Sequence, residues 1–189
     1  MKDKTKGFTL IELMITLAIT VIVLGVIYTF SFTSQKILSS TEINAVLQDE
    51  GRDIENSLVD IGMQAKGIEK INNQDPLTTN KYSTLISTSN RLSISKISMI
   101  YHDDSIYTFE LIGTELTLVK GTGSAKILSK NIKQIQIKPL DYNNVDKHTS
   151  YVANAPGIEV SITLYKKEGL SEITYPISTI LKFRNKGIT

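Results

Sequence analysis

A single carboxylate at the edge of a long apolar run has the clearest chemical meaning in this sequence. Glu12 is followed by an uncharged run at residues 13–35, and the next charged side chain is Lys36. A carboxylate placed in hydrocarbon costs several kcal/mol unless it is paired or reaches the interface. Glu12 therefore needs a cation at its own depth, or backbone N–H groups that it can bind.

Thr9 offers Glu12 a local role. Thr9-x-x-Glu12 has the spacing of a capping box, in which the threonine hydroxyl and the carboxylate satisfy free N–H groups at a helix start. Negative charge is also favoured there by the helix dipole. The pattern predicts a helix that begins near Thr9, and it leaves open a second role for Glu12 that is compatible with the cap.

Oxygen ligands that suit calcium occur in one stretch of turn character. Asp141, Asn143 and Asp146 could contribute such ligands, but the stretch lacks the glycine and the final glutamate of an EF-hand. His102 precedes two aspartates, and a metal site there would need further converging ligands. A solvated turn is the preferred interpretation of His102, and we expect no cofactor.

Residues 120–138 contain five lysines and no acidic residue. As a polyanion site they would need interleaved aromatic residues for base stacking, which the sequence does not provide, and the net charge of the chain is only +2. Solvent-facing strand positions are the preferred interpretation, so nucleic acid is not an expected partner. Cysteine is absent and no catalytic constellation is present, so we expect no enzymatic activity. The lysines are Lys120, Lys126, Lys130, Lys133 and Lys138.

The apolar run is long enough to cross a membrane. About 20 helical residues span a hydrocarbon core about 30 Å thick. A cleaved secretory signal has a shorter apolar core and a small-x-small site, which residues 29–32 do not form. Lysines at positions 2, 4 and 6 favour a cytoplasmic N-terminus. We expect a membrane-spanning helix at residues 8–35, with the residues that follow it outside.

The residues around the start of the run carry more information than an anchor requires. Gly7 closes the basic leader, Phe8 opens the apolar run, and Glu12 stands five positions into it. From Lys6 to about Gly25 the sequence resembles the cleavage and methylation signature of type IV pilins and type II secretion pseudopilins.

The resemblance implies how the N-terminus is processed and used. A prepilin peptidase in the membrane would cut between Gly7 and Phe8 and methylate the new amino group of Phe8. The helix would anchor the chain in the cytoplasmic membrane, and would later pack with other pilins in a filament built on an inner-membrane assembly platform. Glu12 would compensate the N-terminal charge of Phe8 in an adjoining subunit.

Beyond Lys36 the sequence becomes amphipathic. Apolar residues recur every seven positions while acids, Glu50 among them, occupy the other faces, which predicts a helix packed on one side and solvated on the other. We expect one helix from Thr9 to about Lys66, about 87 Å long, whose amphipathic half covers residues 36–68. The apolar stripe consists of Leu47, Ile54, Ile61 and Ile68, with Ile43, Leu58 and Ala65 beside it.

The remaining residues, 69–189, predict a β-rich head behind the leader (1–7) and the helix. Residues 65–82 indicate a connection because turn formers are frequent there, and alternating apolar residues follow. The fold class is therefore α+β, with the long helix packed on an antiparallel sheet. The expected strands are residues 91–101, with a slip near Lys96, and residues 106–112, 115–120, 126–140, 157–166 and 172–184.

The size of the head and its last residues favour one member of the resembled family. The head is larger than the simplest major pilins need, and Leu181–Asn185 resembles the terminal strand of minor pilins and larger pseudopilins. We therefore favour a minor pilin, a structural subunit that helps to start a type IV pilus or decorates its tip. A pseudopilin of a secretion or competence system and a membrane-anchored binding protein that never polymerises are the alternatives.

Overall fold

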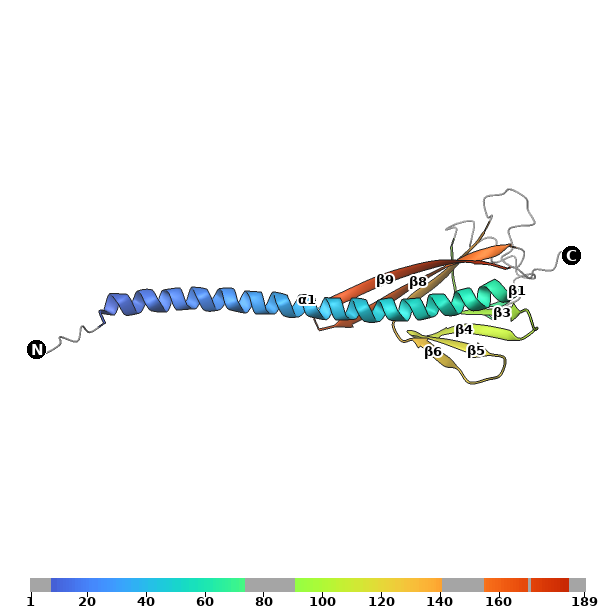
Figure 1. Ribbon diagram of the computed structural model, residues 1–189, viewed down its shortest axis with the longest axis horizontal. Coiled ribbons are helices and arrows are strands. Elements are labelled where there is room, and N and C mark those ends of the chain that lie inside the picture. Colours follow the sequence, from blue (N-terminus) through green and yellow to red (C-terminus); the bar gives the residue numbers. More distant parts are fainter. Residues whose placement is uncertain (1–7, 74–90, 141–154, 170, 184–189) are drawn as a thin grey trace, which may run out of the picture.

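A long helix and two antiparallel sheets make up the structure (Figure 1). This computed structural model describes residues 8–73, 91–140, 155–169 and 171–183. Helix α1 (Leu10–Gln64) has 55 residues, which corresponds to a length of about 80 Å. Its C-terminal half lies against the head, whereas its N-terminal half projects away from it (Figure 1). The predicted α+β class is confirmed.

The described residues form nine strands in two sheets, where the sequence predicted one sheet. The strand order is β1-β3-β4-β5-β6 in the first sheet and β2-β7-β8-β9 in the second. The first sheet consists of β1 (Ala65–Ile71), β3 (Lys96–Tyr101), β4 (Ile106–Ile112), β5 (Glu115–Lys120) and β6 (Lys126–Ser129). The second consists of β2 (Leu92–Ser93), β7 (Ile132–Pro139), β8 (Gly157–Glu168) and β9 (Ser171–Lys182).

Two segments that the sequence predicts as single strands are each divided between the sheets. Residues 91–101 contain β2 of the second sheet and β3 of the first, and residues 126–140 contain β6 of the first and β7 of the second. The slip in alternation near Lys96 marks this change of sheet and not a bulge within one strand. The chain crosses between the sheets twice in these segments, and each crossing is held by a side chain described below.

The helix ends earlier than predicted. It stops at Gln64 instead of continuing to residues 66–68, and Ala65–Ile71 form strand β1 where a connection was expected. β1 pairs with β3, and this pairing buries Ile68 and Ile71 in the core. Ile68 is therefore buried as predicted, but from a strand.

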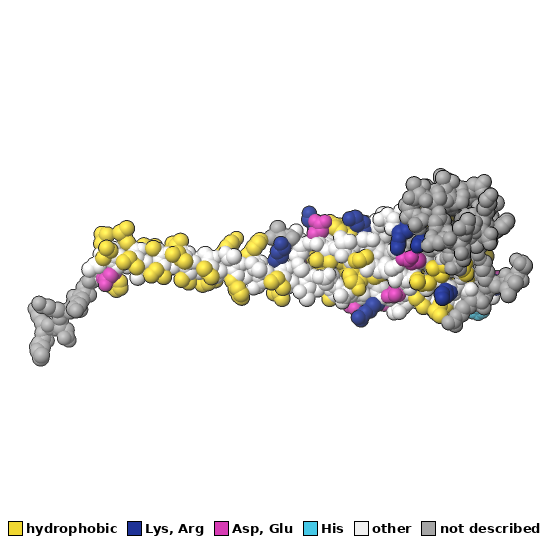
Figure 2. All heavy atoms as spheres, turned by 90° about the horizontal axis from the view of Figure 1, so that it is seen from above, with side chains coloured by type: hydrophobic (Ala, Val, Ile, Leu, Met, Phe, Trp, Pro, Cys, Tyr) yellow, Lys and Arg dark blue, Asp and Glu magenta, His cyan; other side chains and the backbone are white. Residues whose placement is uncertain are grey.

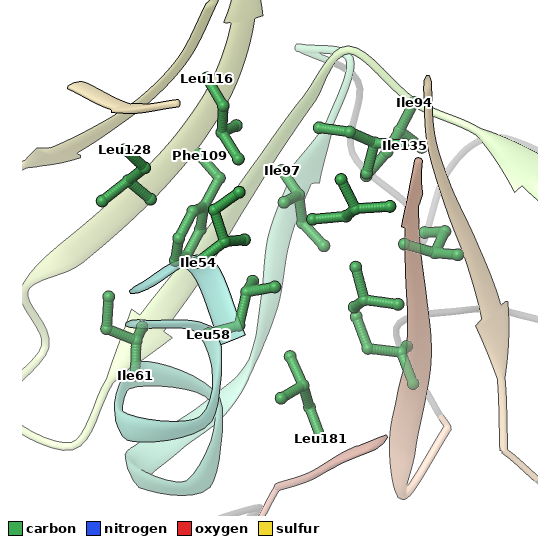
Figure 3. Close-up of a cluster of buried hydrophobic side chains, with 14 of the residues drawn as sticks. Ile54, Leu58, Ile61, Ile94, Ile97, Phe109, Leu116, Leu128, Ile135 and Leu181 are labelled. Carbon is green, nitrogen blue, oxygen red and sulfur yellow. The ribbon is translucent and has the colours of Figure 1, made fainter. Parts of the chain in front are cut away.

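The predicted apolar stripe of α1 faces the core. Ile54, Leu58 and Ile61 lie between side chains of the two sheets (Figure 3). Phe109 approaches from the first sheet and Leu181 from the second (Figure 3). The stripe covers the seam between the sheets, so the helix holds them together. The buried residues of α1 are Ile43, Leu47, Gly51, Ile54, Leu58, Ile61 and Gly62.

Two glycines on this stripe let strand β9 approach the helix closely. A Cβ atom added at Gly62 would lie 2.9 Å from Leu181 Cδ1, and one added at Gly51 would lie 3.2 Å from both Tyr175 Cε1 and Ile177 Cγ2. The helix surface is therefore shaped to receive β9. The apolar periodicity does not reveal this, because glycine counts as neither apolar nor polar in the pattern.

The crossing from β2 to β3 is held by Asn72, directly after β1. Its Oδ1 accepts hydrogen bonds from the backbone N–H groups of Ser95 (2.8 Å) and Lys96 (3.1 Å). The backbone φ of Asn72 is 50°, a left-handed conformation that asparagine tolerates better than most residues. The left-handed backbone of Asn72 therefore follows the last residue of β1, and its side chain fixes the start of β3.

The crossing from β6 to β7 is held by Glu50 of α1. Ser129 Oγ donates to Glu50 Oε2 (2.6 Å), and Asn131 Nδ2 donates to Glu50 Oε1 (2.8 Å). The backbone N–H of Asn131 donates in turn to Ser129 Oγ (3.0 Å). Glu50 is half-buried and joins the helix to the segment between the sheets, so its assignment to the solvated acidic face was wrong.

Replacing Glu50 with alanine is expected to lower the free energy of unfolding by about 2 kcal/mol. Ser129 is buried and would lose a charged acceptor together with Asn131. Thermal unfolding of the full chain in detergent measures the loss. Asp49→Ala, at an exposed position one residue earlier, is the matched control and should leave the melting temperature almost unchanged. Equal losses in the two variants would contradict the role assigned to Glu50.

Candidate functional site

The N-terminal half of α1 has no cover from the described part of the chain. Every residue from Phe8 to Thr33 is exposed, including Phe8 at 78% and Phe30 at 74%. The helix is long and apolar enough to cross a membrane. An exposed apolar surface of this extent marks a site of interaction with lipid or with other proteins. Residues 8–33 are called the rod below.

The predicted capping box is present where the rod begins. Thr9 has an extended backbone, and its Oγ1 accepts a hydrogen bond from the Glu12 N–H at 3.4 Å. Glu12 Oε2 accepts hydrogen bonds from the Thr9 N–H (3.0 Å) and the Thr9 hydroxyl (2.9 Å). These contacts hold the carboxylate at the very start of the helix.

The cap leaves Glu12 able to bind a cation. An ionised carboxylate has two oxygens and about four lone-pair sites, and the Thr9 bonds go to one oxygen. The carboxylate is exposed at the end of the rod, close in the chain to Phe8. Glu12 can therefore cap its own helix and accept hydrogen bonds from an ammonium group of another chain at the same time.

A shallow groove crosses the rod around Gly25. It has a volume of about 610 Å³. The hydroxyls of Thr29 and Thr33 donate to the carbonyls of Gly25 and Thr29 at 2.9 Å, so these polar groups are satisfied within the helix. Small residues such as glycine and threonine allow helices to approach one another closely in lipid. The groove is lined by Ile22, Gly25, Val26, Thr29, Phe30 and Thr33.

His102 and its two aspartates lie in the exposed turn between β3 and β4. Asp103 Oδ1 accepts a hydrogen bond from the Ser105 N–H (2.9 Å), and the bonds from Ser105 hold the pKa of Asp103 below its ordinary value. Asp104 pairs with Lys66 at 2.5 Å. Among the described residues no group of three or more histidines and acids could hold a metal. Asp103 therefore stabilises the turn, and Asp104 joins the turn to Lys66 of strand β1.

The calcium candidates Asp141, Asn143 and Asp146 lie outside the described residues, as does Gly7 at the predicted cleavage site. These four assignments stay predictions from the sequence.

The five lysines are divided between the two sheets. Lys120 and Lys126 belong to β5 and β6, Lys130 lies at the crossing, and Lys133 and Lys138 belong to β7. Two of them also cover aromatic rings of their own sheet: Lys120 Nζ lies 5.2 Å from the Tyr107 ring centre, and Lys133 Nζ lies 5.4 Å from that of Tyr165. The run of lysines in the sequence is therefore divided between the two sheets and does not lie on one strand.

The sequence at the start of the rod matches a known family of N-terminal sequences. Residues 2–28 match the family described as the prokaryotic N-terminal methylation motif, a stretch that contains Gly7, Phe8, Glu12 and most of the rod. The chain matches no curated protein and no solved structure. The resemblance found in the sequence is thus confirmed at the N-terminus. Residues 2–28 of this protein are the signature that type IV pilins and pseudopilins share, joined here to a head of two sheets.

Proposed function

We propose that this protein is a minor pilin, a structural subunit of a type IV pilus that helps to start filament assembly or decorates the tip. The observation that carries the proposal is the rod: it bears the methylation signature, and the described part of the head does not cover it. Hydrocarbon covers such a surface in the membrane, and the helices of other pilins cover it in a filament. Pilins and pseudopilins are structural proteins and not enzymes, and we propose the same kind of role here.

The proposed path runs from the membrane to the filament. Prepilin peptidase cuts between Gly7 and Phe8 and methylates Phe8, while the rod holds the head outside the cytoplasmic membrane. The assembly platform then transfers the rod into a bundle of pilin helices. There Glu12 meets the amino group of Phe8 in a neighbouring subunit, so that each charge has a partner inside the apolar helix bundle.

The head supports a minor rather than a major pilin. Its described residues form two sheets around the helix, and Leu181 near the end of β9 is fully buried against α1. A head of this size is larger than the simplest major pilins need, and on this ground we favour a minor pilin. Two alternatives predict other locations for the protein. They are a pseudopilin of a secretion or competence system and an anchored protein that never polymerises.

Immunogold labelling of sheared filaments with antibody against the head separates these roles. Label at one filament end supports the proposal. Label along the whole shaft would indicate a major pilin, and label confined to membranes would indicate a pseudopilin or a protein that never polymerises. A strain that lacks the gene is the control for antibody specificity.

Replacing Gly25 with leucine is expected to reduce incorporation into filaments several-fold, because the added side chain would fill the groove on the rod. A Cβ atom at Gly25 meets no atom within 4 Å, so the head should keep its melting temperature. Immunoblots of sheared filaments and membranes measure the distribution. Ser31→Leu adds bulk at an exposed rod position outside the groove and is the control. Equal incorporation of both variants would argue against the groove as a packing site.

A further inference from the structure

The hairpin between β8 and β9 extends along α1 toward the rod (Figure 1). Ser171, the first residue of β9, is buried, and its hydroxyl donates to the Lys36 carbonyl at 3.4 Å. The hydroxyl of Ser40 donates to Ser171 Oγ at 3.1 Å. The hairpin is thereby fastened to the helix at the first charged residue after the apolar run.

The end of the hairpin reaches a further helical turn toward the rod. Glu168 and Gly169 line a groove of about 290 Å³ together with Phe32 and Gln35 of α1. The backbone φ of Gly169 is 56°, which suits a tight turn at this point. The hairpin end therefore lies beside the last residues of the uncharged run.

This position coincides with the expected edge of the hydrocarbon. The run from Leu13 to Phe32 is about 20 residues and about 30 Å of helix, which equals the thickness of the hydrocarbon core. If Glu12 stands at one interface, Phe32 stands at the other. This step rests on the membrane anchor of the proposed function. The hairpin end then lies at the depth of the lipid headgroups.

Basic side chains outnumber acidic ones there. Lys36 and Lys167 are exposed, and Lys166 forms an ion pair with Glu168 at 3.4 Å. Lys133 adds a further positive charge above the Tyr165 ring. The acids of the hairpin end are Glu168 and Glu172. In Figure 2 an acidic side chain stands at the start of the rod, and the next charged side chains along the helix are seen where the rod meets the head. An anionic lipid surface attracts such a cluster.

We propose that residues 166–169, together with Lys36, form a foot that rests on the outer surface of the membrane and binds the phosphate groups of anionic lipids. The charged foot does not enter hydrocarbon, so it sets the depth of the helix and the height of the head before assembly. Extraction into a filament must break these contacts.

Single-cysteine labelling tests the foot directly, because the natural chain has no cysteine. A fluorophore is attached to the full chain at Lys167→Cys and, as a control at the far end of the head, at His102→Cys. The protein is placed in vesicles of phosphatidylcholine with about one third phosphatidylglycerol, with a nitroxide on a fraction of the headgroups. Position 167 should be quenched several times more strongly than position 102. Equal and weak quenching at both would overturn the foot.

A label at Ile22→Cys separates failure of the foot from failure of the anchor. Quenching of position 22 by a nitroxide on the acyl chain, without headgroup quenching at 167, would leave the anchor intact and reject the foot. No quenching at 22 would reject both. Weaker quenching at 167 is expected in pure phosphatidylcholine, and also when Lys36→Gln and Lys166→Gln are combined. Protection of 167 only in assembled filaments would overturn the foot and assign the surface to a neighbouring pilin.

Discussion

A chain in which Glu12 is replaced by alanine is expected to be processed and anchored but absent from pili. Loss of the carboxylate leaves the amino group of Phe8 in a neighbouring subunit without a partner at its depth in the helix bundle. The head is far from this end of α1 and should fold normally (Figure 1). Immunoblots of the sheared filament fraction and of the membrane fraction measure the effect.

The capping box makes a sharper version of this experiment possible. Glu12→Gln keeps a side chain that can still accept hydrogen bonds from Thr9 but removes the charge, whereas Thr9→Ala removes the cap and keeps the charge. If the charge directs assembly, Glu12→Gln should be nearly as defective as Glu12→Ala, and Thr9→Ala should still enter filaments. If Glu12→Gln entered filaments and Thr9→Ala did not, Glu12 would act only as a helix cap.

Replacing Gly157 with alanine is expected to destabilise the head by about 3 kcal/mol or more, because the new methyl group has no room. A Cβ atom at Gly157 would lie 2.1 Å from the Leu181 carbonyl oxygen and 3.0 Å from Lys182 Cα. Both atoms belong to the backbone of β9, which is paired with β8 and packed against α1. The strand must move, and the core around Leu181 moves with it.

Gly67→Ala is the matched control for this substitution. Gly67 lies in strand β1, and a Cβ atom there meets nothing within 4 Å. Thermal unfolding of the full chain in detergent should show a large fall in melting temperature for Gly157→Ala and little change for Gly67→Ala. An alanine at 157 that is tolerated as well as one at 67 would show that β9 does not approach β8 as closely as the structure places it.

The sequence predicts the parts of the fold that depend on local periodicity. The stripe through Leu47, Ile54 and Ile61 is buried as its seven-residue spacing requires, and Thr9 caps the helix as its spacing from Glu12 indicates. Both patterns involve residues within a few turns of one helix. They need no knowledge of what the helix packs against.

The division into two sheets could not be predicted in the same way. Alternation of apolar residues tells which side chains face a core, but it does not tell which strand is the partner, so the pattern predicts one strand where β2 and β3 lie. Likewise Glu50 resembles the other acids of α1 until Ser129 and Asn131, which are 79 and 81 residues later in the chain, are placed beside it. The sequence predicts a connection at Ala65–Ile71 because the strand character of this segment depends on pairing with β3.

The most direct test of the account is the mass of the N-terminus of the native protein. Intact mass and peptide mass spectrometry of chains purified from membranes and from pili should find that the protein begins at a methylated Phe8, and that Gly7→Leu blocks this processing. A native chain that keeps its first seven residues in both fractions would contradict the account, because no new amino group would then exist for Glu12 to meet.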